Sequence, residues 1–114
     1  MERKLILFAC HKGGTSGIAA GYFRKFAEKA APGAYNVEHM ALDFEGSYAN
    51  PFDEQKLLNA DHIVCFYDYH LRDIGEKLKK AGTGAKMHYY PQLVYRGKPD
   101  KGWNEQLLEE IAKS

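Results

Sequence analysis

The chain has 114 residues, 45% of them hydrophobic, and its 16 basic and 15 acidic side chains give a formal net charge of +1. We therefore expect a single domain over residues 1–114 with an ordinary core. The balanced, interspersed charge excludes recognition of nucleic acid through bulk electrostatics. No apolar stretch approaches the roughly 18 residues of a membrane span. Because the start of the chain also lacks the features of a signal peptide, we expect a cytoplasmic protein.

Strand and helix patterns alternate from the first residues onward. Residues 4–10 form an almost continuous apolar run, which is typical of a strand buried on both faces. A helix is predicted over about 16–31 and ends at Pro32-Gly33. Residues 35–42 alternate like a strand with one wetter face. The helix carries its core-facing stripe at Ala19, Tyr22, Phe23, Phe26 and Ala30.

The middle of the chain continues this alternation. Residues 43–50 are rich in turn formers, and Asn50-Pro51 then has the composition of a helix start. Residues 62–67 form a third apolar strand. A helix over about 70–81 follows it and ends at Gly82.

The last part of the chain completes the pattern. A fourth strand is predicted over 86–95, where Pro91 implies an edge strand or a bulge, and a final helix covers about 102–113. Four strands separated by helices indicate an α/β fold: a four-stranded parallel sheet with helices on both faces, a flavodoxin-like three-layer arrangement. The residues at core spacing in the later helices are Phe52, Leu57, Leu58, Leu71, Ile74, Leu78, Trp103, Leu107, Leu108 and Ile111.

A cysteine stands where the first strand ends and a glycine-rich turn leads into a helix. A thiol near a helix N-terminus is favoured as thiolate by the positive end of the helix dipole. Free backbone N–H groups of such a turn can bind phosphate oxygens. Cys10 is thus either a nucleophile above an anion cradle or a small buried core residue. The cradle residues are His11, Lys12, Gly13, Gly14, Thr15, Ser16 and Gly17.

Other polar residues carry weaker signals. Cys65 lies in the middle of the third strand and is interpreted as a core residue, a free thiol rather than half of a disulfide. The loop has Gly17 where a nucleotide-binding loop needs its lysine, which argues against ATP or GTP. The five histidines lack metal-ligand spacing, so neither a metal nor another cofactor is expected. His11 either supports the thiolate or points into solvent, and His62 and His88 fit strand positions with ordinary contacts.

Two later segments are candidates for the same site. Asp100 is either a helix cap or a general acid on a loop that reaches the cysteine. The segment Tyr67-Asp68-Tyr69-His70 follows the third strand, so it lies on the same sheet edge as the cysteine loop. It either forms a wall of the site or caps the next helix through Asp68.

Three patches of the sequence resemble the low-molecular-weight protein tyrosine phosphatases and the related arsenate reductases. They are residues 5–24, with the strand, cysteine and helix; residues 60–74, with the third strand and its helix; and residues 99–103. The resemblance implies the phosphatase fold and a cysteinyl-phosphate formed on Cys10. It also implies that Ser16 donates a hydrogen bond to the sulfur and that Asp100 protonates the leaving group.

The chain departs from that family at important positions. If Ser16 matches the family's serine, the loop is one residue short and Thr15 replaces the arginine that clamps the transferring phosphoryl group. Loss of one preorganised donor costs about 10²–10³ in rate, so weak activity or none is expected. Lys12, Arg72 and Arg96 are the candidate substitutes. Proline also precedes Asp100, whereas the family has the order Asp-Pro.

The loop itself also resembles the phosphotransferase-system IIB components of the lactose/cellobiose type. Cys10, Gly13, Thr15 and Ser16 match their spacing, with Gly17 in place of a last serine. That likeness implies a carrier that takes a phosphoryl group from a donor protein and needs no Asp100. The expected partners are phosphate or a phosphorylated small molecule or protein. A non-catalytic module that retains only the fold is the third interpretation.

Overall fold

The computed structural model describes residues 3–10, 14–41, 54–90 and 102–113, and at residues 10, 14–16, 41 and 54 it describes the backbone only. Strands and helices alternate through these residues, as the sequence predicts. The elements are β1 (Lys4–Cys10), α1 (Gly14–Ala30), β2 (Tyr35–Ala41), α2 (Glu54–Asn59), β3 (His62–Cys65), α3 (Asp68–Ala81), β4 (Lys86–Tyr89) and α4 (Gly102–Lys113).

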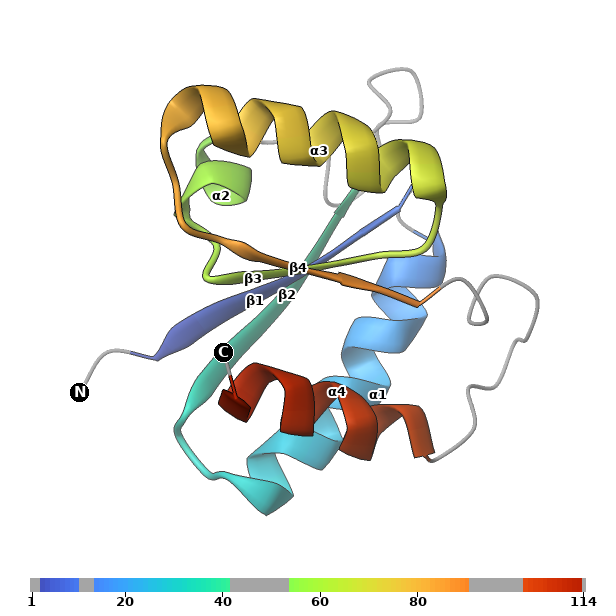
Figure 1. Cartoon of the computed structure of the whole chain (residues 1–114). Helices are drawn as coiled ribbons and strands as arrows, with labels where there is room; N and C mark the ends of the chain where they lie inside the picture. The colour runs from blue at the N-terminus through green and yellow to red at the C-terminus, as the bar shows by residue number, and fades with distance from the viewer. Residues whose placement is uncertain (1–2, 11–13, 42–53, 91–101, 114) are drawn as a thin grey trace.

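The four strands form one parallel sheet in the order β2-β1-β3-β4. From β1 the chain moves outward to β2, and from β3 it moves in the opposite direction to β4. Right-handed crossovers in opposite directions place their helices on opposite faces of the sheet. Figure 1 shows the result, with α2 and α3 over one face and α1 and α4 over the other. The predicted three-layer α/β fold is confirmed.

The sheet separates two apolar cores. On one face Phe8 packs with Phe23 of α1 and Trp103 of α4, with ring centroids 5.7 and 6.1 Å apart. On the other face Leu7 packs with residues of α2 and α3. Successive strand side chains point to opposite faces, so β1 supplies both cores, which explains its unbroken apolar run.

Several predicted boundaries and burial assignments are wrong. Helix α1 begins at Gly14, two residues early, and β3 ends at Cys65 because Tyr67 already occupies the extended N-cap position of α3. Tyr22 is 46% exposed and Ala30 is also exposed. The face of α1 that meets the sheet and α4 instead includes Ala19, Ala20, Phe23 and Ala27.

The remaining helix predictions are largely confirmed. In α3 the core positions Ile74 and Leu78 are buried, whereas Leu71 is half-buried and His70 is buried beside it. Gly82 ends α3 with φ +73°, a left-handed conformation that glycine adopts without strain. Predictions for residues 43–52 and 91–95 lie outside the described residues. None of the helices in the described ranges combines the length and apolar character needed to cross a membrane.

Candidate functional site

The carboxyl ends of β1 and β3 form the point at which the strand order reverses. Open parallel sheets bind ligands beyond the strands at such a point, because the connections on either side diverge and leave a crevice. Cys10 is the last residue of β1, and the preceding Ala9 pairs with Cys65, the last residue of β3. The structure therefore places the backbone of Cys10 and the segment Tyr67–His70 at the same edge of the sheet.

The junction between β1 and α1 joins the end of a strand to the start of a helix. Only His11–Gly13 separate the end of β1 from the start of α1, and these residues lie outside the described part of the chain, as do the side chains of Cys10, Thr15 and Ser16. The first turn of α1 contains no acidic residue. Its unpaired N–H groups and the positive end of its dipole thus come within a few residues of Cys10 without a competing carboxylate in that turn.

A histidine that the sequence analysis did not single out packs against this helix start. A Cβ built on Gly17 would lie 3.3 Å from Nε2 of His39, so the glycine allows the ring to approach closely. Burial is the main cause that lowers the pKa of His39, with the charges of Arg24 and Lys56 acting in the same direction. His39 therefore adds a neutral imidazole near the first turns of α1. The sequence feature that could have identified His39 is its position near the carboxyl end of the strand predicted over residues 35–42.

The segment after β3 forms an aromatic cluster. The rings of Tyr67 and Tyr69 lie 5.5 Å apart, and His70 lies 5.3 Å from Tyr67 and 4.2 Å from Tyr69. His70 is buried and Tyr69 is 39% exposed. The alternative role of Asp68 as the helix cap is wrong, because Tyr67 is the N-cap and Asp68 already lies in the first turn. The Asp68 carboxylate still interacts favourably with the positive end of the helix dipole.

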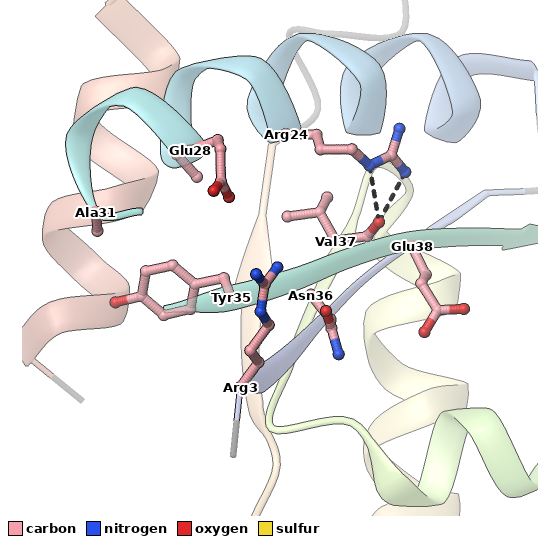
Figure 2. A pocket seen from close by; sticks show the side chains of 9 residues that line it. Arg3, Arg24, Glu28, Ala31, Tyr35, Asn36, Val37 and Glu38 are labelled. Atoms are coloured by element: carbon pink, nitrogen blue, oxygen red, sulfur yellow. Dashed lines mark hydrogen bonds between the residues drawn. The ribbon is translucent and has the colours of Figure 1, made fainter. Parts of the chain in front are cut away.

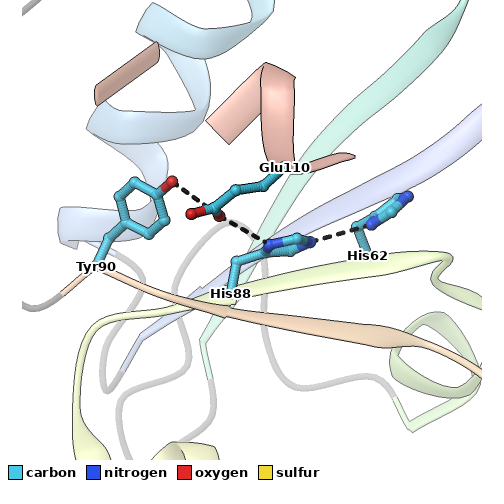
Figure 3. Close-up of polar contacts among 4 residues, drawn as sticks. All are labelled: His62, His88, Tyr90 and Glu110. Carbon is cyan, nitrogen blue, oxygen red and sulfur yellow. Dashed lines mark hydrogen bonds and ion pairs between the residues drawn. The ribbon is translucent and has the colours of Figure 1, made fainter. Parts of the chain in front are cut away.

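The interpretation of Cys65 as a core residue is confirmed. Its side chain is fully buried, and this burial raises the pKa of the thiol to about 12. Its thiolate is therefore negligible at neutral pH, and Cys65 is no nucleophile. His62 and His88 occupy strand positions as expected, and Nδ1 of His62 lies 3.1 Å from Nε2 of His88 in a buried hydrogen bond (Figure 3).

A cleft of about 480 Å³ lies elsewhere, between α1 and the sheet-edge strand β2 (Figure 2). Nε and Nη2 of Arg24 donate to the carbonyl of Val37 at 3.2 and 2.7 Å. These bonds cover an acceptor on an edge strand, which otherwise invites pairing with another chain. Because Glu28 and Glu38 line the cleft together with Arg3 and Arg24, its charge is balanced and does not select an anion.

Asp100 lies outside the described residues, and so do Lys12 and Arg96. Arg72 is exposed in α3 and pairs with the adjacent Asp73 at 3.3 Å. Among the residues that the structure describes, no group of three histidine, cysteine or acidic side chains could hold a metal ion. No family model matches the sequence, and no curated protein matches it.

Proposed function

We propose that this chain is a low-molecular-weight phosphatase-like protein that binds phosphate or a similar oxyanion at the loop after β1, with weak phosphatase activity or none. The observation that carries the proposal is the position of Cys10: it ends β1 at the reversal point of the sheet, and only three residues separate it from a 17-residue helix. The dipole and N–H groups of that helix favour both a thiolate and a bound anion.

The proposed chemistry has two steps. The thiolate of Cys10 attacks phosphorus, a sulfur–phosphorus bond forms, and the bond to the leaving oxygen breaks as Asp100 donates its proton. Water then attacks phosphorus, Asp100 takes the water proton, and the sulfur–phosphorus bond breaks to regenerate the thiolate. Backbone N–H groups of residues 11–17 hold the oxygens, and Ser16 donates to the sulfur.

Two features of the neighbouring strand support this assignment. Tyr67 and Tyr69 bring aromatic rings to the same sheet edge, where they suit an aryl substrate. Cys65, which ends β3, is buried in the core, and its thiol has a raised pKa. It therefore supplies no second thiolate that could compete with Cys10 as the nucleophile.

The test is turnover of an aryl phosphate, with Cys10→Ser and Cys65→Ala as matched variants. We expect slow turnover that Cys10→Ser abolishes and Cys65→Ala retains. Turnover that survives Cys10→Ser excludes the mechanism. If the wild-type chain is inactive, an NMR titration with inorganic phosphate decides whether the cradle exists: shifts of the Gly13–Gly17 amides support it, and unchanged amides leave only a non-catalytic module.

A phosphocarrier is the second candidate, and the spacing of Cys10, Gly13, Thr15 and Ser16 favours it because this loop has no arginine. A carrier holds the phosphoryl group on sulfur and passes it to a partner, so it needs no general acid. A long-lived phosphorylated Cys10 that forms only from a phosphorylated donor protein selects the carrier. Rapid loss of that phosphoryl group to water selects the phosphatase.

A further inference from the structure

A chain of hydrogen bonds links α4 to residues of β3 and β4 and to Tyr90, which follows β4. The hydroxyl of Tyr90 lies 3.0 Å from Oε2 of Glu110, and Nδ1 of His88 lies 3.2 Å from the same oxygen. Nε2 of His88 lies 3.1 Å from Nδ1 of His62. Figure 3 shows the four side chains in this order. Tyr90, His88 and His62 are 2%, 8% and 2% exposed, whereas the side chain of Glu110 is 41% exposed, so the histidine end is buried and the carboxylate reaches solvent.

The acceptor chemistry of a carboxylate fixes where the protons lie. An ionised Glu110 can only accept, so the Tyr90 hydroxyl and Nδ1–H of His88 both donate to it. A neutral His88 then has an unprotonated Nε2, which accepts. His62 must therefore donate from Nδ1, and its own Nε2 carries no proton. Each hydrogen bond in the chain is satisfied in this state.

One added proton can enter without breaking the chain. It binds Nε2 of His62, the proton on Nδ1 of His62 passes to Nε2 of His88, and the positive charge then lies next to the Glu110 carboxylate. A second proton makes both facing nitrogens N–H donors at 3.1 Å, and their hydrogen bond is lost. We propose that His62 and His88 form a buried site for a single proton, and that a second proton loosens β4 from β3.

The surrounding charges favour this order of events. Lys4 of β1 and Lys86 of β4 oppose a charge on His62, as does a charged His88, whereas Asp61 before β3 favours it. Burial is the largest effect, and together these groups lower the pKa of His62 to about 4. Protonation of both histidines therefore requires acidic pH. Glu110 and Tyr90 face the other end of the pair.

The proton site lies one strand away from β1, because His62 pairs with Ile6 in the parallel sheet. Trp103, at the start of α4, packs edge-on against Phe8 with ring centroids 6.1 Å apart. Phe8 precedes Cys10 by two residues on β1. The chain of hydrogen bonds therefore ends on a helix, α4, that also packs on the strand leading to the cysteine loop, although the proton site does not depend on any reaction there.

The first test is the protonation of each imidazole nitrogen, measured by ¹⁵N NMR between pH 9 and pH 4. We expect both rings to carry their proton on Nδ1 at high pH. As the pH falls, His88 becomes doubly protonated while Nδ1 of His62 loses its proton. Independent titration of the two rings, each gaining one proton in the same pH range without this exchange, would overturn the proposal.

Variants at adjacent positions of α4 provide a matched comparison. Glu110→Gln keeps the size of the side chain but removes the charge that faces the relayed proton, so the passage of the proton from His62 to His88 should be lost. Glu109→Gln should leave it unchanged, because Glu109 pairs with Lys113 at 3.2 Å. Equal effects of the two variants would contradict the role of Glu110.

The second test is hydrogen exchange of the wild-type chain. Between pH 7 and pH 4.5 the protection factors of β4 amides should fall roughly tenfold or more beyond any fall in β2, the other edge strand of the sheet. In His62→Phe the remaining ring holds one proton beside Glu110, so this selective loss should disappear. Equal loss in β2 and β4, or none, would overturn the loosening of β4. The wild-type measurement decides this even if the variant fails to fold.

Discussion

At the scale of single residues, our proposal assigns opposite roles to the two cysteines. Both end neighbouring strands of the sheet. Cys65 is packed in the interior, and burial raises the pKa of its thiol to about 12. Cys10 is separated by three residues from the N-terminus of a long helix, which under our proposal favours a thiolate. The same side chain therefore serves as core at one position and as candidate nucleophile at the other.

This contrast predicts the thiol chemistry of the native chain. Burial leaves Cys65 with roughly 10³ times less thiolate than an ordinary cysteine at neutral pH. We expect a disulfide reagent at pH 7.5 to modify one thiol rapidly in the folded protein and two after unfolding. Cys10→Ser should remove the rapid reaction, and Cys65→Ala should leave it. A rapid reaction at Cys65 would contradict the structure's closed core around β3.

At the scale of elements, α1 serves two purposes on two faces. Phe23 and Ala27 pack on the sheet side, whereas Ile18 and Tyr22 are 53% and 46% exposed. Arg24 reaches the edge strand β2 and caps the carbonyl of Val37. The helix thus both completes a core and protects the sheet edge.

The two interior glycines of α1 make a matched pair of substitutions. A Cβ at Gly21 meets nothing within 4 Å, so Gly21→Ala should gain about 1 kcal/mol of stability from helix propensity. A Cβ at Gly17 would meet His39 at 3.3 Å, so Gly17→Ala should gain less or destabilise. The free energy of unfolding in urea measures both.

The double variant Gly17→Ala/His39→Ala isolates the contact. Removal of the ring should allow Gly17→Ala to recover its full gain relative to His39→Ala alone. Equal gains at positions 17 and 21 in the wild-type background would mean that His39 does not press on α1. In that case the assignment of His39 to the surroundings of the cysteine loop would fail.

At the scale of the whole molecule, buried titratable groups define a pH range of stability. The folded-state pKa of His62 is lowered to about 4 from 6.5, so its neutral form is favoured by folding. The neutral, buried His62 therefore contributes on the order of 3 kcal/mol to the free energy of unfolding above pH 6.5. This contribution is lost as the pH falls toward 4. The raised pKa values of Cys65 and Tyr90 act in the opposite direction.

These pKa shifts predict that the free energy of unfolding is greatest over a middle pH range and falls on both its acidic and its alkaline flank. On the alkaline side, stability is present below the ordinary thiol pKa of 9.0 and is lost as the pH rises toward 12, because Cys65 must ionise. We expect the urea unfolding free energy to be greatest between about pH 6.5 and 9. His62→Phe should flatten the acidic flank and leave the alkaline one. An unfolding free energy that stays constant from pH 7 to pH 4.5 would contradict the burial of a neutral His62.

The order of elements and the fold class could be predicted from the sequence, because strand and helix periodicities are local. The apolar run of residues 4–10 indicated a strand buried on both faces, and β1 indeed contributes to both cores. The alternation of strands and helices, with right-handed crossovers, then limited the sheet to a parallel one. The position of Cys10 at a strand end was also visible in the sequence. Its role stays a prediction.

Only the tertiary structure decided which side chains meet across elements. The burial of Ala20 instead of Tyr22 depends on where α1 meets the sheet and α4, and the approach of His39 to Gly17 joins residues 22 positions apart. The pairing of His62 with His88 and Glu110 depends on strand register and on the docking of α4. The spacing of apolar residues along the chain indicates which side chains prefer burial, because that preference belongs to each residue type. Which side chains contact one another depends on the packing of segments that are distant in the sequence.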